Sequence, residues 1–163
     1  GEVLWNDRPV SNRQVNAFRS QVVYLHQRAS LAEGSVEDVL RSPFLLHVHR
    51  QQQFDRDRVL DGLTTLGRDA RFLTKWSGDL SGGEAQIVAL LRVLQLDPAV
   101  LLLDEPLSAL DDETREEVHG VLSDINRHTS VTTLHITHNR ADAEALADVV
   151  HILSPSGIDP SDP

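Results

Sequence analysis

The sequence predicts an α/β fold with a mostly parallel sheet. Segments typical of strands alternate along the chain with segments typical of helices, which is the pattern of parallel sheets with helical crossovers. The continuous apolar run Val-Leu-Leu-Leu at 100–103 is what a strand buried on both faces requires. Asp104 and Glu105 follow this run directly, at the end of the strand where open α/β sheets place their ligands.

The composition limits the class of protein and its partners. The 163 residues contain no internal repeat and are enough for about one domain with a sizeable core. The chain has no cysteine, which excludes disulfides and thiolate chemistry and fits a cytoplasmic location. The net charge of −10 and the single lysine argue against a nucleic-acid footprint. We therefore expect no nucleic-acid partner.

The first 27 residues predict short elements that lead into one strand. A short strand over 1–4 and a turn over 7–9 are expected, followed by a helical turn over 11–18 that begins at a serine. The apolar residues within 21–26 then predict a strand that ends just before Gln27.

Residues 28–77 have a helical character, with many glutamines and arginines and no β-rich run. The sequence from Ser35 to Asp38 is typical of a helix start, and Ser42-Pro43 of a helix stop. A second helix over 54–66 is predicted by four apolar residues at helical spacing, namely Val59, Leu60, Leu63 and Leu66. Gly67 is expected to end it.

A third helix begins at Ser81-Gly82-Gly83-Glu84. Ser81 can cap this helix, and Glu84 can bond back to the N–H of the cap. The two glycines leave backbone N–H groups bare at the positive end of the helix dipole, which favours an anion. The apolar residues that follow predict a mostly buried helix up to Leu94, and Asp97-Pro98 is expected to stop it.

The alternation continues after the 100–103 strand. The next elements are expected to be a helix with an acidic first turn after Asp111, a strand over 131–137, a helix from Asn139 to Leu146, and a strand over 149–153. The last residues, 154–163, are rich in Pro, Ser and Asp and are expected to be a flexible tail.

Five motifs in this order resemble those of the ABC ATPase family. They are the Q-loop glutamine Gln27, the signature motif Leu80-Ser81-Gly82-Gly83-Glu84, the Walker B strand 101–105, the D-loop Ser108-Ala109-Leu110-Asp111, and the switch histidine His138. The resemblance implies a P-loop NTPase-like core with a helical subdomain. It divides the chain into 1–27 (the end of the N-terminal core portion), 28–77 (the helical subdomain), 78–153 (the C-terminal half of the core) and 154–163 (the tail).

The resemblance also implies ATP and Mg²⁺ as cofactors. Asp104 would hold Mg²⁺, and Glu105 would act as general base towards the attacking water. His138 would contact the γ-phosphate and keep the water in register with Glu105. Gln27 would reach Mg²⁺ and relay contact with a transmembrane permease subunit. The alternatives are solvated carboxylates at a strand end, a histidine on a surface loop, and a polar residue that ends a strand.

The signature and D-loop residues are implied to act across a dimer. Ser81, Gly82 and Gly83, with Glu84, would bind the γ-phosphate of ATP held by a second ABC ATPase subunit, in a head-to-tail homo- or heterodimer. Ser108 and Asp111 would face the dimer interface. Simple helix capping by Ser81 and Asp111 is the alternative. Glu84 replaces the usual glutamine, and Ile87 stands where an arginine often follows Gln86.

The sequence contains no Walker A motif of the form Gly-x-x-x-x-Gly-Lys-Ser/Thr, which would cradle the phosphates. In the family this motif precedes the Q-loop, and 26 residues precede Gln27 here. Two explanations are open. Either the chain is a fragment or truncated product, or it is a subunit that has lost half of its nucleotide site.

The resemblance gives one main function and two alternatives. The main reading is the ATP-hydrolysing subunit of an ABC transporter, cytoplasmic and peripheral on the inner face of the cell membrane. The segment around Phe72 to Lys75 resembles the iron-export subgroup. One alternative is a non-catalytic subunit that lends its signature motif to a partner. The other is an ABC ATPase acting on nucleic acid, which the short, heptad-free segment between Gln27 and Ser81 disfavours.

Overall fold

A three-stranded parallel sheet lies at the centre of the molecule. The computed structural model describes residues 1–108, 110–154 and 157–160. The sheet has the order β3-β4-β5 and consists of β3 (Val22–Leu25), β4 (Val100–Asp104) and β5 (Thr132–Ile136). Both pairings are parallel. The predicted α/β class with a mostly parallel sheet is confirmed.

The pairing register places the carboxyl ends of the three strands together. Leu25 pairs with Leu103, and Leu103 pairs with His135. Asp104 at the end of β4 pairs with Ile136 at the end of β5. The segments that follow these strands therefore leave the sheet at the same edge.

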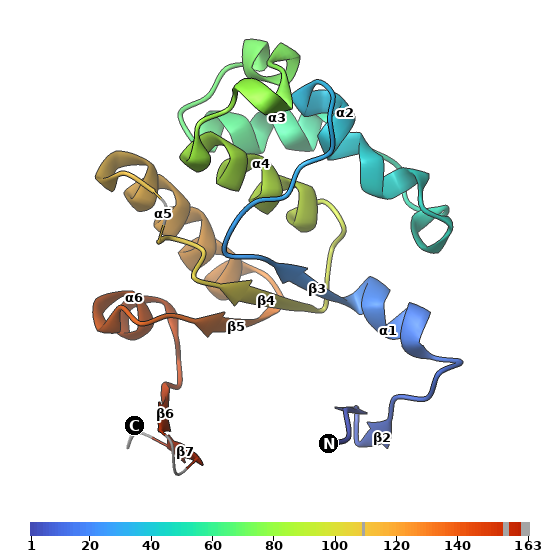
Figure 1. The fold of residues 1–163 in the computed structure, drawn as a ribbon, viewed down its shortest axis with the longest axis vertical. Helices are drawn as coiled ribbons and strands as arrows, with labels where there is room; N and C mark the ends of the chain where they lie inside the picture. The colour runs from blue at the N-terminus through green and yellow to red at the C-terminus, as the bar shows by residue number, and fades with distance from the viewer. Residues whose placement is uncertain (109, 155–156, 161–163) are drawn as a thin grey trace.

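Helix α4 (Gly82–Leu94) lies between the sheet and the helices formed by residues 36–79 (Figure 1). It begins with the predicted capping box, in which Ser81 and Glu84 exchange side-chain and backbone hydrogen bonds. Its buried residues include all six from Gln86 to Leu91. Such a helix is apolar on most of its circumference because it has packing partners on more than one side.

Short helices form a layer beyond α4 (Figure 1). They are α2 (Val36–Arg41), η1 (Ser42–Leu45), η2 (His47–His49), α3 (Arg56–Thr65), η3 (Ala70–Thr74) and η4 (Ser77–Asp79). Helix α2 has the capping box that the sequence predicts, formed by Ser35 and Asp38. Gly67, with φ +62°, follows α3 where a helix end was expected.

Helix α5 (Asp112–His128) and helix α6 (Arg140–Leu146) follow β4 and β5. The side chains of Asp111 and Asn139 cap them by accepting hydrogen bonds from backbone N–H groups of the first turn. In the described part of the chain α5 is the longest helix, at 17 residues. None of the helices there combines the length and the apolar character needed to cross a membrane.

The amino-terminal segment differs in detail from the prediction. The strands β1 (Leu4–Trp5) and β2 (Arg8–Pro9) form a small hairpin, and its turn is made by Asn6 and Asp7. Helix α1 (Val15–Gln21) begins later than expected. Ser11 bonds to the side chain of Gln14 instead of capping the helix, so the predicted helix start at Ser11 is wrong.

The carboxyl-terminal segment also differs. Strand β6 (His151–Ser154) pairs antiparallel with β7 (Gly157–Pro160), in a two-stranded sheet separate from the central one. The flexible tail expected over 154–163 thus includes a paired strand. Residues 155, 156 and 161–163 lie outside the described residues, so the expectation stays a prediction for them.

One face of the central sheet is uncovered by the described chain. Leu25, Leu101 and Leu103 face the helices and are buried, because alternate residues of a strand point to opposite faces. On the other face Tyr24 and Leu134 are 40% and 57% exposed. Parallel sheets are normally covered on both faces.

Two glycines allow a direct test of backbone conformation. Gly67→Ala should lower the free energy of unfolding by about 1–2 kcal/mol, because an L-residue is strained at positive φ. Its Cβ would also meet Glu117 Oε1 at 2.6 Å. Gly120→Ala in α5, where a Cβ meets nothing within 4 Å, should instead raise it by about 0.5–1 kcal/mol. Urea unfolding measures both, and equal changes in the two variants would contradict this account.

A second test uses His135 on β5. Burial lowers the pKa of His135 from its ordinary value, and nearby His119 lowers it further. The unfolded chain therefore binds more protons than the folded one below about pH 6.5, so stability should fall as the pH drops through that range. His135→Leu should reduce this dependence below about pH 6.5, measured by urea unfolding at fixed temperature. An unchanged slope in the variant would contradict the assignment.

Candidate functional site

Asp104 ends β4 at the edge where the three strands finish. Its Oδ2 accepts a hydrogen bond of 2.6 Å from the Tyr24 hydroxyl on the neighbouring strand. This hydrogen bond is the main reason why the pKa of Tyr24 is raised above its ordinary value, followed by desolvation and the negative charge of Asp104. The hydroxyl thus keeps its proton and fixes one carboxylate oxygen.

Glu105 has an unusual backbone conformation. Its φ is +49°, in the left-handed region that a residue with a long side chain seldom adopts. Three hydrogen bonds to the backbone of Glu105 hold it in this conformation. Its N–H donates to the carbonyl of Ile136 at 2.9 Å, and its own carbonyl accepts from the N–H and the hydroxyl of Ser108 at 3.2 and 2.9 Å. Strain that surrounding contacts hold in place is typical of functional positions.

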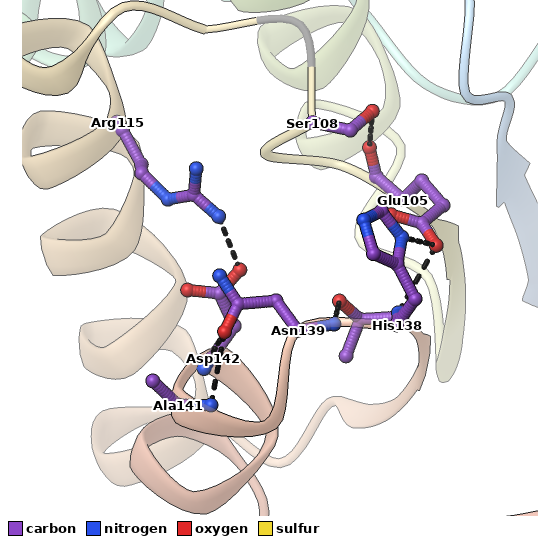
Figure 2. Close-up of polar contacts among 8 residues, drawn as sticks. Glu105, Ser108, Arg115, His138, Asn139, Ala141 and Asp142 are labelled. Carbon is purple, nitrogen blue, oxygen red and sulfur yellow. Dashed lines mark hydrogen bonds and ion pairs between the residues drawn. The ribbon is translucent and has the colours of Figure 1, made fainter.

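The Glu105 carboxylate is bound twice by His138 (Figure 2). Oε1 accepts from the backbone N–H of His138 at 3.1 Å and from its ring Nδ1 at 2.6 Å. The side chain of Glu105 is 16% exposed, whereas that of His138 is 80% exposed. The glutamate is thus held in place while the imidazole faces solvent.

The segment that carries His138 is fixed by the start of α6 (Figure 2). Asn139 donates its N–H to the Thr137 hydroxyl and accepts from the N–H groups of Ala141 and Asp142 with its side chain. The Asp142 carboxylate lies 2.6 Å from the Arg115 guanidinium, which joins α6 to α5. These contacts set the direction from which His138 reaches Glu105.

This arrangement can support metal-assisted hydrolysis. Mg²⁺ prefers oxygen ligands and is commonly held by one or two carboxylates together with phosphate oxygens and water. Asp104 is a carboxylate of this kind, so the donor chemistry at the end of β4 fits the ion. No cluster of three or more potential metal-ligating His, Cys, Asp or Glu side chains occurs within residues 1–108, 110–154 and 157–160.

The signature motif forms a separate, exposed surface. Ser81 and Gly82 are exposed, and a Cβ at Gly82 would meet nothing within 4 Å. A Cβ at Gly83 would lie 3.6 Å from Leu110 and 3.9 Å from Asp111. Gly83 therefore lies beside the described end of the D-loop. Ala109 of that loop lies outside the described residues.

Gln27 lies in an exposed turn after β3. It makes no hydrogen bond to Asp104, Glu105 or His138, all of which belong to the described part. The segment around it is tied to α4, because the buried side chain of Gln86 donates to the carbonyl of His26 at 3.5 Å.

The structure thus brings some of the predicted residues together and leaves others apart. Asp104, Glu105 and His138 meet at the ends of the strands, with Ser108 beside them. Ser81, Gly82, Gly83, Glu84 and Asp111 belong to the other surface. Asp111 caps α5, and the pKa of its carboxyl is lowered chiefly by the Thr114 N–H and then by the Thr114 hydroxyl. The roles of these residues remain predictions.

Two contacts of the site were not predicted from the sequence. Tyr24 bonds to Asp104, and Arg115 holds Asp142 beneath the His138 segment. Both depend on which residues of neighbouring elements lie opposite one another, which spacing along the chain does not specify. A polar aromatic residue within an otherwise apolar strand was the only signal for Tyr24.

Comparison with known proteins identifies the family. The sequence profile of the family described as ABC transporter matches residues 1–108. The chain is 36% identical over 154 residues to the lipoprotein-releasing system ATP-binding protein LolD of Myxococcus xanthus, covering 90% of this chain and 66% of that protein. It is 35% identical over 155 residues to the probable iron export ATP-binding protein FetA of Escherichia coli, covering 95% and 67%.

The relatives are longer than this chain. The chain is 35% identical to ABC transporter I family member 17 of Arabidopsis thaliana, covering 91% of this chain and 55% of that protein. It spans about half to two thirds of the length of these first relatives.

Solved structures share the fold. The CbiO1 protein of Clostridium perfringens, part of the ABC transporter complex CbiONQ, matches with a TM-score of 0.73 at 24% identity, covering 93% of this chain and 61% of that one. The dimeric ATP-binding cassette MJ0796 bound to ADP and Pi matches with a TM-score of 0.75 at 23% identity, covering 89% and 66%. The profile match and the relatives together show that the chain belongs to the ABC transporter ATP-binding family.

Proposed function

We propose that this chain is part of the ATP-hydrolysing subunit of an ABC transporter, which couples Mg·ATP hydrolysis to transport by a separate membrane protein. The observation that carries the proposal is the double hydrogen bond from His138 to Glu105, next to Asp104 at the end of β4. A carboxylate of fixed orientation beside a metal-binding carboxylate is what the hydrolysis of a phosphoanhydride by water requires.

Each residue of this group has a role in the proposed reaction. Asp104 holds Mg²⁺, which neutralises charge on the phosphates. Glu105 accepts a proton from the attacking water, while His138 fixes the carboxylate and presents its exposed ring to the γ-phosphate. Gln27 reaches the metal and the water from the loop after β3.

The signature surface serves a second subunit in this proposal. Ser81, Gly82 and Gly83 bind the γ-phosphate of ATP held by that subunit, and Ser108 and Asp111 line the interface. The exposure of Ser81 and Gly82 and the open space at Gly82 support this role, because a phosphate must approach the helix start closely.

A permease contact is proposed on the helical subdomain. Leu45, Leu46 and Val48, in and between η1 and η2, are 80%, 57% and 44% exposed. Clustered exposed apolar side chains mark interaction sites. Binding there would place the subunit on the cytoplasmic face of a membrane. Two of the relatives are named for lipoprotein release and probable iron export, and these differences select no transported substrate.

A second candidate function keeps the fold without the chemistry. The 163 residues contain a complete signature motif but no Walker A motif. A subunit of this kind would complete the ATP site of a partner that has its own Walker A motif, and would not itself turn over ATP.

The first test concerns Glu105 in a protein that joins these residues to a Walker A segment. Glu105→Gln should reduce ATP turnover by about 10²–10⁴ while retaining ATP binding, because the amide has a similar shape but cannot take the proton. Phosphate release and nucleotide binding measure the two effects.

The matched control is Glu144→Gln, which removes an exposed carboxylate paired with Arg140 on α6. This change should leave turnover unchanged. Turnover by Glu105→Gln within tenfold of the parent would remove Glu105 from the role of general base.

The second test concerns the 163-residue chain alone, which should not bind ATP appreciably. Backbone amides and the lysine of a Walker A motif supply most of the affinity for triphosphate, and a net charge of −10 repels a polyanion. Equilibrium binding of a fluorescent ATP analogue with Mg²⁺ measures this. The same chain joined to a Walker A segment is the control, and a micromolar dissociation constant for the chain alone would contradict the expectation.

A further inference from the structure

Lys75, the single lysine of the chain, contacts the signature motif. Its Nζ lies 2.6 Å from Glu84 Oε1. The other oxygen of that carboxylate, Oε2, accepts the backbone N–H of Ser81 at 3.0 Å. One carboxylate therefore joins the ammonium group to the residue that caps α4.

The position of Lys75 is fixed by its surroundings. Its carbonyl accepts the N–H of Val36 at 2.9 Å, and Trp76 forms a β-bridge with Ser35. The ammonium lies 5.2 Å from the centre of the Phe72 ring, within the range of a cation–π contact. A side chain whose backbone is held and whose ammonium contacts an aromatic ring loses less freedom when it forms an ion pair.

The charge of Glu84 creates an electrostatic conflict at this helix start. The positive end of the α4 dipole favours an anion there, but a carboxylate in the first turn already occupies that field. Glutamine at this position would form the same capping box without the negative charge. The Lys75 ammonium and then the N–H of Ser81 lower the pKa of the Glu84 carboxyl, because both interactions favour its charged form.

We propose that Lys75 is a positioning residue of the signature motif, which offsets the charge of Glu84 and so allows the motif to accept the phosphate of ATP on a second subunit. The inference rests on the proposed function of the signature surface. It assigns a role to a residue outside the motif and links that role to the glutamate that this chain has in place of glutamine.

If Lys75 had a purely structural role, Lys75→Met would lower the thermal unfolding temperature. Its side chain is 48% exposed, and ion pairs in such positions contribute little to stability. Lys75→Met should therefore leave the thermal unfolding temperature nearly unchanged. Its effect should be seen in the titration of Glu84 and in ATP-driven association.

The first measurement is the titration of the Glu84 carboxyl by NMR, in a protein that joins these residues to a Walker A segment. Lys75→Met should raise the pKa of Glu84 towards its ordinary value. The control Arg71→Met removes the nearby Asp69–Arg71 ion pair, 2.6 Å long, and should leave the titration of Glu84 unchanged. An unchanged Glu84 titration in Lys75→Met would overturn the proposal.

The second measurement is ATP-driven dimerisation in the Glu105→Gln background, where turnover is blocked. Lys75→Met should weaken dimerisation by about fivefold, the size expected for one unbalanced charge at a helix end. The double variant Lys75→Met/Glu84→Gln should dimerise as strongly as the parent, because the charge to be offset is gone.

The outcomes distinguish the charge-offset role of Lys75 from the proposed function of the signature surface. If the double variant dimerised as weakly as Lys75→Met alone, both compared with the parent, the charge-offset role would be overturned, since the lysine would then act through something else. If the parent shows no ATP-driven dimerisation, the proposed function of the signature surface fails, and the Glu84 titration still decides whether Lys75 governs that carboxylate.

Discussion

The parallel register of β4 with its two neighbours is the constraint on which the site depends. Because the three strands run in the same direction, the residues after their last hydrogen-bonded pairs emerge together. Tyr24 can then bond to Asp104 on one side, and His138 can bond to Glu105 on the other. A slip of one residue in either pairing would turn these side chains to the opposite faces of the sheet.

Helix α4 connects this edge to the signature surface. Its middle is buried against the sheet and the helical layer, so its direction is set by core packing. Its first turn remains exposed, with the cap at Ser81 and the Lys75–Glu84 pair. Gln86, one turn further along, donates to the loop that leads to Gln27. One well-packed helix thus orients residues on two surfaces.

Local chemistry made much of the fold predictable from the sequence. The starts of α2, α4 and α6 were correctly assigned because Ser35, Ser81 and Asn139 are capping residues followed by suitable partners. The helix start at Ser11 was wrong because its hydroxyl bonds to a side chain instead. The contact between Tyr24 and Asp104 could not be predicted, since these residues are 80 positions apart and only strand pairing brings them together.

The left-handed conformation of Glu105 marks this residue independently of any motif. Four non-glycine residues of the described chain have positive φ, and the other three are Asn6, Asp7 and Asp97. Short side chains of that kind adopt the conformation readily in turns, whereas glutamate does not. Backbone geometry alone would therefore direct attention to Glu105 in a distant relative whose sequence around this position had changed beyond alignment.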